Sequence, residues 1–130
     1  MKFKVQDIDI PNKNGRIYSA PVLQRAIEKF NTIYIKENRA FLCGHRPGLE
    51  EYSLSDIIGM VRFIGIENNK VMADVEKLNI NDMEELWGLL EQDKLSIRMS
   101  GVGTLIRQLD GNYFVEDYEL ERLIVTNDPA

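Results

Sequence analysis

The chain has 130 residues, 44% hydrophobic and 28% charged, a composition typical of a globular protein that excludes the disordered and fibrous classes. Its formal net charge is −5, from 16 basic and 21 acidic residues, and no stretch gathers the lysines and arginines of a nucleic-acid surface. The single cysteine excludes an internal disulfide, and the longest apolar-rich stretch, residues 57–66, is too short to span a bilayer. We therefore expect one domain over residues 1–130, used inside a cell, with no signal peptide in its first residues.

The first third of the sequence predicts a strand, a helix and two further strands. Residues 2–10 alternate between apolar and polar side chains, and the turn residues 11–15 follow. Ser19 is placed to cap a helix that carries Pro21 in its first turn. The apolar residues of this helix recur at helical spacing: Leu23, Ala26, Ile27 and Phe30. Residues 32–35 and 40–44 are expected to be strands, and residues 45–53 a polar loop.

The remainder predicts two hairpins separated by a second helix. Two β-rich runs, residues 57–66 and 70–78, flank Asn68 and Asn69, which tolerate positive φ. Asn81 and Glu84 form a capping box for a helix. Its apolar face comprises Met83, Leu86, Trp87 and Leu90.

The last third returns to strands. Residues 94–108 and 113–130 read as strands, with a turn at Asp110 and Gly111. Six or seven strands and two helices indicate an α+β, mainly β fold. We expect a curved antiparallel β-barrel with helices flanking it.

His45 is the only histidine, so any mechanism that uses imidazole near neutral pH must use this residue. A two-histidine metal site is excluded, and a site built from Cys43, His45 and Glu50 or Glu51 lacks the second ligand pair of structural zinc. We expect no metal and no cofactor. As alternatives, His45 is a solvated loop residue, and Cys43 is a buried small hydrophobe rather than a nucleophile.

A serine nucleophile is most conspicuous in the stretch from Ser96 to Gly103, where Ser96 or Ser100 precedes two glycines. Backbone N–H groups at Gly101 and Gly103 could approach an oxyanion, and Arg98 could add positive potential. The structural alternative is a bulged strand with two outward-facing serines.

Several separated stretches resemble the prohead (procapsid) maturation proteases of tailed phages. Residues 12–27 begin with an Asn-x-Asn-Gly-Arg-x-Tyr run that is similar to the N-terminal signature of the family. Residues 41–47 look like the segment that carries the family's histidine, and residues 94–105 look like its serine strand. Residues 120–130 resemble the closing strand. The resemblance implies the fold of the herpesvirus maturation protease, a seven-stranded, largely antiparallel barrel with flanking helices.

The resemblance also implies a serine protease with a Ser-His-acid triad. His45 matches the general base, Ser96 the nucleophile and Glu121 the acid. Other residues match supporting or alternative roles: Arg98, Gly101, Val102 and Gly103 for the oxyanion, Ser100 as alternative nucleophile, and Asp117 or Glu119 as alternative acid.

The implied substrates are scaffold or core proteins and the major capsid protein, cleaved inside the assembling prohead in the bacterial host cytoplasm. Activation by self-association is implied as well, with no nucleic-acid or membrane partner. The family's His-Pro pair reads His45-Arg46-Pro47 here, which favours the alternative of an inactive capsid- or scaffold-binding module of the same fold. Many relatives carry a C-terminal extension beyond the point where this chain ends, so a trimmed or truncated catalytic core is expected.

Overall fold

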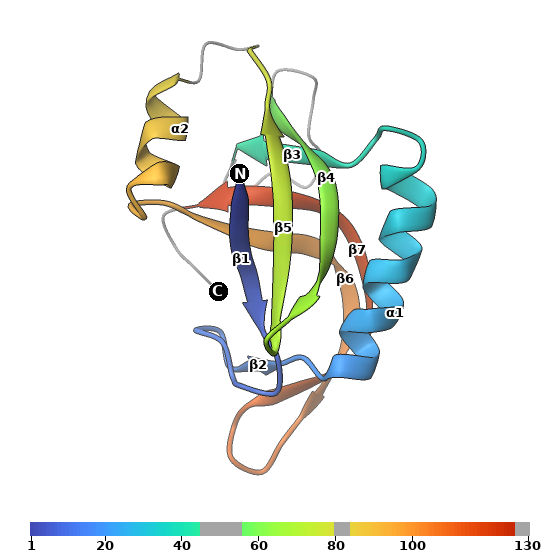
Figure 1. The fold of residues 1–130 in the computed structure, drawn as a ribbon. Helices are drawn as coiled ribbons and strands as arrows, with labels where there is room; N and C mark the ends of the chain where they lie inside the picture. Colours follow the sequence, from blue (N-terminus) through green and yellow to red (C-terminus); the bar gives the residue numbers. More distant parts are fainter. Residues whose placement is uncertain (45–55, 80–83, 127–130) are drawn as a thin grey trace.

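The computed structural model describes residues 1–44, 56–79 and 84–126 (Figure 1). The elements in chain order are β1 (Lys2–Asp7), β2 (Arg16–Ile17), α1 (Ala20–Phe30), the π-helical turn η1 (Asn31–Ile35), β3 (Phe41–Gly44), β4 (Ile57–Glu67), β5 (Lys70–Lys77), α2 (Glu84–Glu91), β6 (Ser96–Arg107) and β7 (Tyr113–Thr126). The mainly β, α+β class predicted from the sequence is confirmed.

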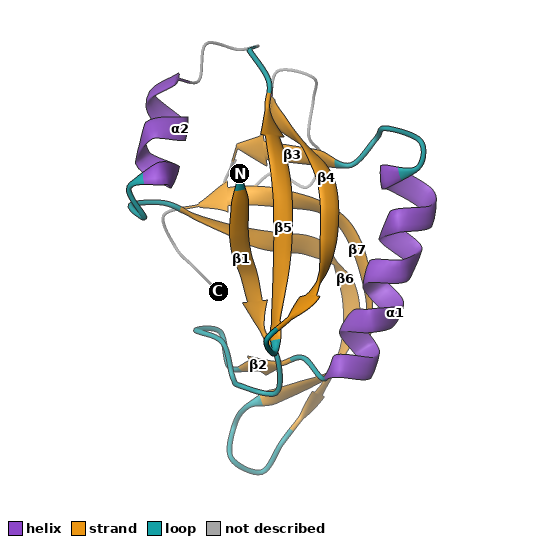
Figure 2. Cartoon of the chain, in the orientation of Figure 1, coloured by secondary structure: helices purple, strands orange, loops and turns teal. Residues whose placement is uncertain are grey.

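The described strands form one curled sheet in the order β1-β5-β4-β3-β7-β2, with β6 paired to β7. Most pairs are antiparallel, but β2 and β3 both run parallel to β7. β1, β5 and β4 form the front layer, and β6 and β7 curve behind them (Figures 1 and 2). β1 approaches β6 without pairing to it, so the described barrel has an open seam between these two strands.

Both predicted hairpins are confirmed by turns that need positive φ. Asn68 and Asn69, between β4 and β5, have φ values of 51° and 61°. Gly111, between β6 and β7, has a φ of 90°. Asparagine and glycine accept this left-handed conformation more readily than other residues, which is why the sequence signal was reliable here.

Helix α1 forms where the apolar spacing predicted it and packs against β7. Ser19 is at the N-cap, although its side chain makes no capping hydrogen bond. The prediction of a strand over residues 32–35 is wrong, because these residues extend α1 as η1. The Phe30 and Tyr34 rings lie 5.1 Å apart, and this contact and the packing of Ile35 against the core outweigh the strand preference of the local sequence.

Helix α2 packs onto the core through the buried side chains of Trp87 and Leu90. The predicted cap at Asn81 and the apolar Met83 lie outside the described residues. A Cβ on Gly59 of β4 would lie 2.8 Å from the Glu76 backbone oxygen and 3.1 Å from the Trp87 ring, so the strand pairing and the indole leave no room for a side chain here. No helix in the described part of the chain is long and apolar enough to cross a membrane.

Candidate functional site

Strand β7 lies between β3 and β6 and brings two of the predicted catalytic segments close together (Figure 1). Gly44, the last residue of β3, pairs with Val125, and Val125 pairs with Ile97 on β6. Neighbouring strands are about 4.8 Å apart, so Gly44 and Ile97 are about 10 Å apart across β7. The predicted base, His45, follows Gly44 in the chain and lies outside the described residues.

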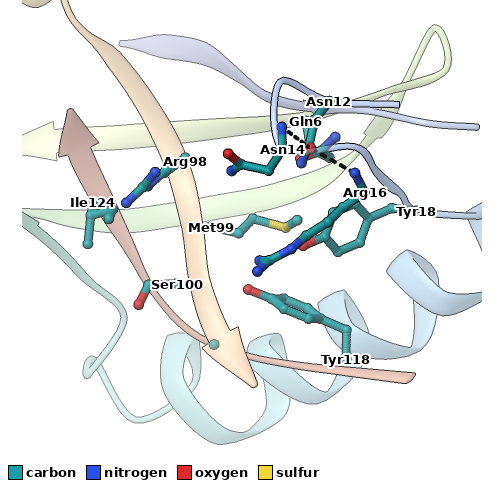
Figure 3. A pocket seen from close by; sticks show the side chains of 11 residues that line it. Gln6, Asn12, Asn14, Arg16, Tyr18, Arg98, Met99, Ser100, Tyr118 and Ile124 are labelled. Carbon is teal, nitrogen blue, oxygen red and sulfur yellow. Dashed lines mark hydrogen bonds between the residues drawn. The ribbon is translucent and has the colours of Figure 1, made fainter. Parts of the chain in front are cut away.

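Ser96 is the first residue of β6, opposite Thr126 and one position from Ile97. Ile97 and Met99 face the core, so the partly exposed Ser96, Arg98 and Ser100 belong to the other face of the strand. Figure 3 shows Arg98 and Ser100 on one side of β6 and Met99 on the other. Ser96 is therefore accessible on a face of the sheet, close to the end of β3.

Ser100 lies four residues further along β6, about 13 Å from Ser96 in an extended strand. It pairs with Arg122, whose Nη1 donates a hydrogen bond of 3.5 Å to the Ser100 Oγ. Ser100 thus faces a cation rather than the strand end that precedes His45.

The three acids predicted from the sequence occupy different positions on β7. Glu121 falls in a β-bulge, where the register shifts between Ser100 and Gly101, and it has no direct partner on β6. Asp117 accepts a hydrogen bond of 3.0 Å from the Thr104 backbone N–H. Glu119 forms an exposed ion pair of 3.1 Å with Lys29. Of the three, Glu121 lies nearest to Val125, yet four residues of strand, about 13 Å, separate them.

Asp56 is an acid that the sequence analysis missed. It is buried, with 9% exposure, and directly precedes Ile57, the partner of Cys43 on β3. A Cβ placed on Gly44 would lie 4.0 Å from the Asp56 backbone oxygen. Asp56 therefore lies at the end of β3, closer to Gly44 than any acid of β7. Only the pairing of β3 with β4 reveals this proximity.

Cys43 is buried, as we expected for a small hydrophobic residue rather than a nucleophile. It has 2% exposure and packs with Ile57 and Ile124. Burial raises the pKa of the Cys43 thiol to about 11, and the Arg122 guanidinium only partly offsets this effect. The thiol is therefore protonated at neutral pH, which is unfavourable for a nucleophile.

Gly101 and Gly103 have a packing reason to be glycine. A Cβ on Gly101 would overlap the Glu119 backbone oxygen and lie 3.0 Å from the Tyr118 hydroxyl. A Cβ on Gly103 would overlap the Asp117 oxygen and lie 3.1 Å from the Tyr118 ring. Both glycines are five or more residues from Ser96 in the same strand. An oxyanion hole at Gly101 would therefore lie beside Ser100 rather than beside Ser96. Arg98 lies two residues from Ser96 on the same face of β6, so it is a cation close to the predicted nucleophile.

A polar cavity of about 290 Å³ opens between the β1–β2 segment and β6 (Figure 3). Its walls include Asn12, Asn14 and Arg16 from the Asn-x-Asn-Gly-Arg run. Arg98 and Tyr118 line it from the opposite side. This N-terminal motif therefore contributes to a cavity next to the predicted serine strand.

No protein-family model matches the sequence, and no curated protein matches it. The fold does match a solved structure, the bacteriophage T4 capsid assembly protease, gp21, with a TM-score of 0.81. The match covers 95% of this chain and 80% of that chain at 13% sequence identity. The two chains share a fold, and the resemblance to phage prohead proteases is confirmed at that level.

Proposed function

We propose that this chain is a serine endopeptidase that cleaves capsid and scaffold proteins during assembly of a phage head in the bacterial host cytoplasm. The observation that carries the proposal is the fold shared with the T4 capsid assembly protease over 95% of the chain. The position of Ser96, two strands from the residue that precedes the only histidine, supports the serine mechanism.

In the proposed mechanism, the Ser96 Oγ attacks the scissile carbonyl while His45 accepts its proton. His45 then returns the proton to the leaving amine. Arg98 stabilises the negative charge on the tetrahedral intermediate, because it shares the face of Ser96 on β6. Water then hydrolyses the acyl-enzyme, with His45 again acting first as the base and then as the acid.

Two acids are candidates to orient the imidazole. The sequence resemblance assigns this role to Glu121. The strand pairing favours Asp56 instead, because Asp56 is buried beside the end of β3 and Glu121 is about 13 Å from Val125. Amide substitution of the true partner should lower kcat far more than KM, because the imidazole would lose its orientation.

A fluorophosphonate probe tests the nucleophile directly, because only an activated serine displaces its fluoride. We expect one mass addition, mapped to the tryptic peptide that holds Ser96. Ser96→Ala should abolish labelling and lower hydrolysis of labelled casein by about 10⁴- to 10⁶-fold. Ser100→Ala is the matched control, on the same strand and face, and should retain activity within a few-fold.

The outcomes separate the competing mechanisms. Labelling that persists in Ser96→Ala and disappears in Ser100→Ala would move the nucleophile to Ser100, with Gly101 and Glu121 beside it. An unlabelled wild type without hydrolysis, measured at low and high protein concentration, would favour the capsid- or scaffold-binding module. Comparison of Asp56→Asn with Glu121→Gln identifies the acid.

A further inference from the structure

The cavity between the β1–β2 segment and β6, here called the seam pocket, is a polar site that the proposed triad does not use. It lies where the curled sheet fails to close between β1 and β6. Figure 3 shows the Arg16 side chain extending into it, with its guanidinium directed toward the Tyr118 hydroxyl. The seam pocket is therefore lined by a cation that reaches it from the start of β2.

The local backbone holds Arg16 in this position. The Asn12 Oδ1 accepts hydrogen bonds from the backbone N–H groups of Asn14 and Arg16, at 2.9 Å and 3.0 Å. Gly15, with a φ of 74°, completes the turn, and its carbonyl oxygen accepts a hydrogen bond of 2.7 Å from the Tyr113 N–H. Such an Asn-centred turn fixes the direction in which the next side chain leaves the backbone. Arg16 is thus preorganised at the mouth of the pocket.

Arg98 is a second cation in the lining of the pocket, and the other polar groups that line it are neutral. No carboxylate in the described part of the chain forms an ion pair with Arg16, and none lines the pocket. The rings of Tyr18 and Tyr118 meet edge to face at 5.4 Å. Burial raises the pKa of both tyrosines, so their hydroxyls are protonated hydrogen-bond donors at neutral pH. Glu121 is near enough to raise the pKa of Tyr118 further, but less than burial does.

An arginine fork with a second arginine and neutral amide and hydroxyl donors around it matches the two oxygens of a carboxylate. The edge of β6 lies beside the pocket, which indicates that the carboxylate belongs to a peptide. β6 pairs with β7 along one side only. β1 approaches part of the other side without pairing to it, so within the described structure the backbone groups on that side have no strand partner. An extended peptide can hydrogen-bond to such an edge while one of its residues enters the neighbouring pocket.

We propose that the seam pocket binds a carboxylate carried by an extended peptide, with Arg16 as the recognition residue. Two peptide groups have this chemistry, an acidic side chain and a C-terminal carboxylate. A role in selecting the residues that are cleaved rests on the proposed protease function, whereas carboxylate binding does not require turnover.

Three heptapeptides of Thr, Val and Ser test the pocket. The first is acetylated and amidated with a central Glu, the second has Gln in its place, and the third is the Gln peptide with a free C-terminal carboxylate. Each is titrated into the ¹⁵N-labelled full chain carrying Ser96→Ala, so that binding is read without cleavage. We expect a carboxylate peptide to bind at least about tenfold more tightly than the neutral peptide, with amide shifts at Gly15 and Gly101.

Arg16→Gln should remove this preference, and Arg25→Gln should keep it. Arg25 is an exposed arginine on α1 outside the pocket, so both variants change the net charge equally. Arg16→Lys keeps the charge but loses the fork, and it should weaken the preference. A preference for the Glu peptide identifies a side-chain site, and a preference for the free-acid peptide identifies a chain-end site.

The proposal is overturned if all three peptides bind equally, if none binds up to about 1 mM, or if Arg16→Gln retains the preference. If carboxylate binding is confirmed and the wild type still hydrolyses nothing, the binding proposal is supported and the proposed protease function is contradicted. If hydrolysis is confirmed without any carboxylate preference, the protease function is supported and the binding proposal is contradicted.

Discussion

At the scale of single residues, burial decides which groups can react. Cys43 and Ser96 both lie in the sheet near the β3–β7–β6 junction. Cys43 packs between Ile57 and Ile124, whereas Ser96 is partly exposed. A buried thiol with a raised pKa is a poor nucleophile, so the accessible hydroxyl is the better candidate although its intrinsic reactivity is lower.

Replacement of Cys43 tests this assignment through the pH dependence of stability. The folded-state pKa of about 11 lies above the ordinary value of 9.0. The thiol's contribution is therefore present below pH 9 and is lost as the pH rises through 11. Between pH 8 and pH 11, wild type should lose about 2 kcal/mol more unfolding free energy than Cys43→Ala in urea titrations. Equal losses in the two proteins would contradict the burial of the thiol. The proposed peptidase activity should be unchanged in the variant.

At the scale of elements, close contacts between neighbours explain several local sequence choices. Tyr118 lies against Gly101 and Gly103 of the adjacent strand, and Trp87 of α2 lies against Gly59 of β4. In each case a backbone oxygen of the adjacent strand and an aromatic side chain together occupy the space that a side chain would need. Gly88 of α2 lacks such a reason, because a Cβ placed on it would meet no neighbouring atom within 4 Å.

Alanine substitution separates these two kinds of glycine. Gly101→Ala would force its new methyl group against the Glu119 backbone, so we expect a loss of about 2 kcal/mol or more in unfolding free energy. Gly88→Ala should instead raise stability by about 0.5 to 1 kcal/mol, because alanine is the better helix former and the space is open. Chemical denaturation measures both changes. Equal effects of the two variants would show that the space around Gly101 is not restricted.

At the scale of the whole molecule, one core joins both helices to the curled sheet. Trp87 of α2, Phe30 of α1 and Leu123 of β7 belong to the same buried cluster. Elements that share one core unfold together, since none of them can lose its contacts without exposing the others.

The single tryptophan offers a probe of this cooperativity. We expect Trp87 fluorescence and far-ultraviolet circular dichroism to report the same thermal midpoint, within about 2 °C. A fluorescence transition well below the dichroism transition would mean that α2 detaches before the barrel unfolds. Leu90→Ala, which removes a second buried contact of α2, should lower both midpoints together.

Several elements could be predicted from the sequence because their signals are local. The turns at Asn68-Asn69 and Gly111 depend on the φ preference of those residues, and the start of α1 depends on apolar spacing. The resemblance to phage proteases also came from short runs of sequence, and it is confirmed for the fold. These features are readable because neighbouring residues alone set them.

Which distant segments meet could be read only from the folded chain. The parallel pairing of β3 with β7 puts Gly44 two strands from Ile97, and pairing with β4 brings Asp56 to the same end. The open seam between β1 and β6 likewise joins Arg16 to Tyr118 in one pocket. Strand order and register depend on contacts between residues far apart in the chain, and no local preference encodes them.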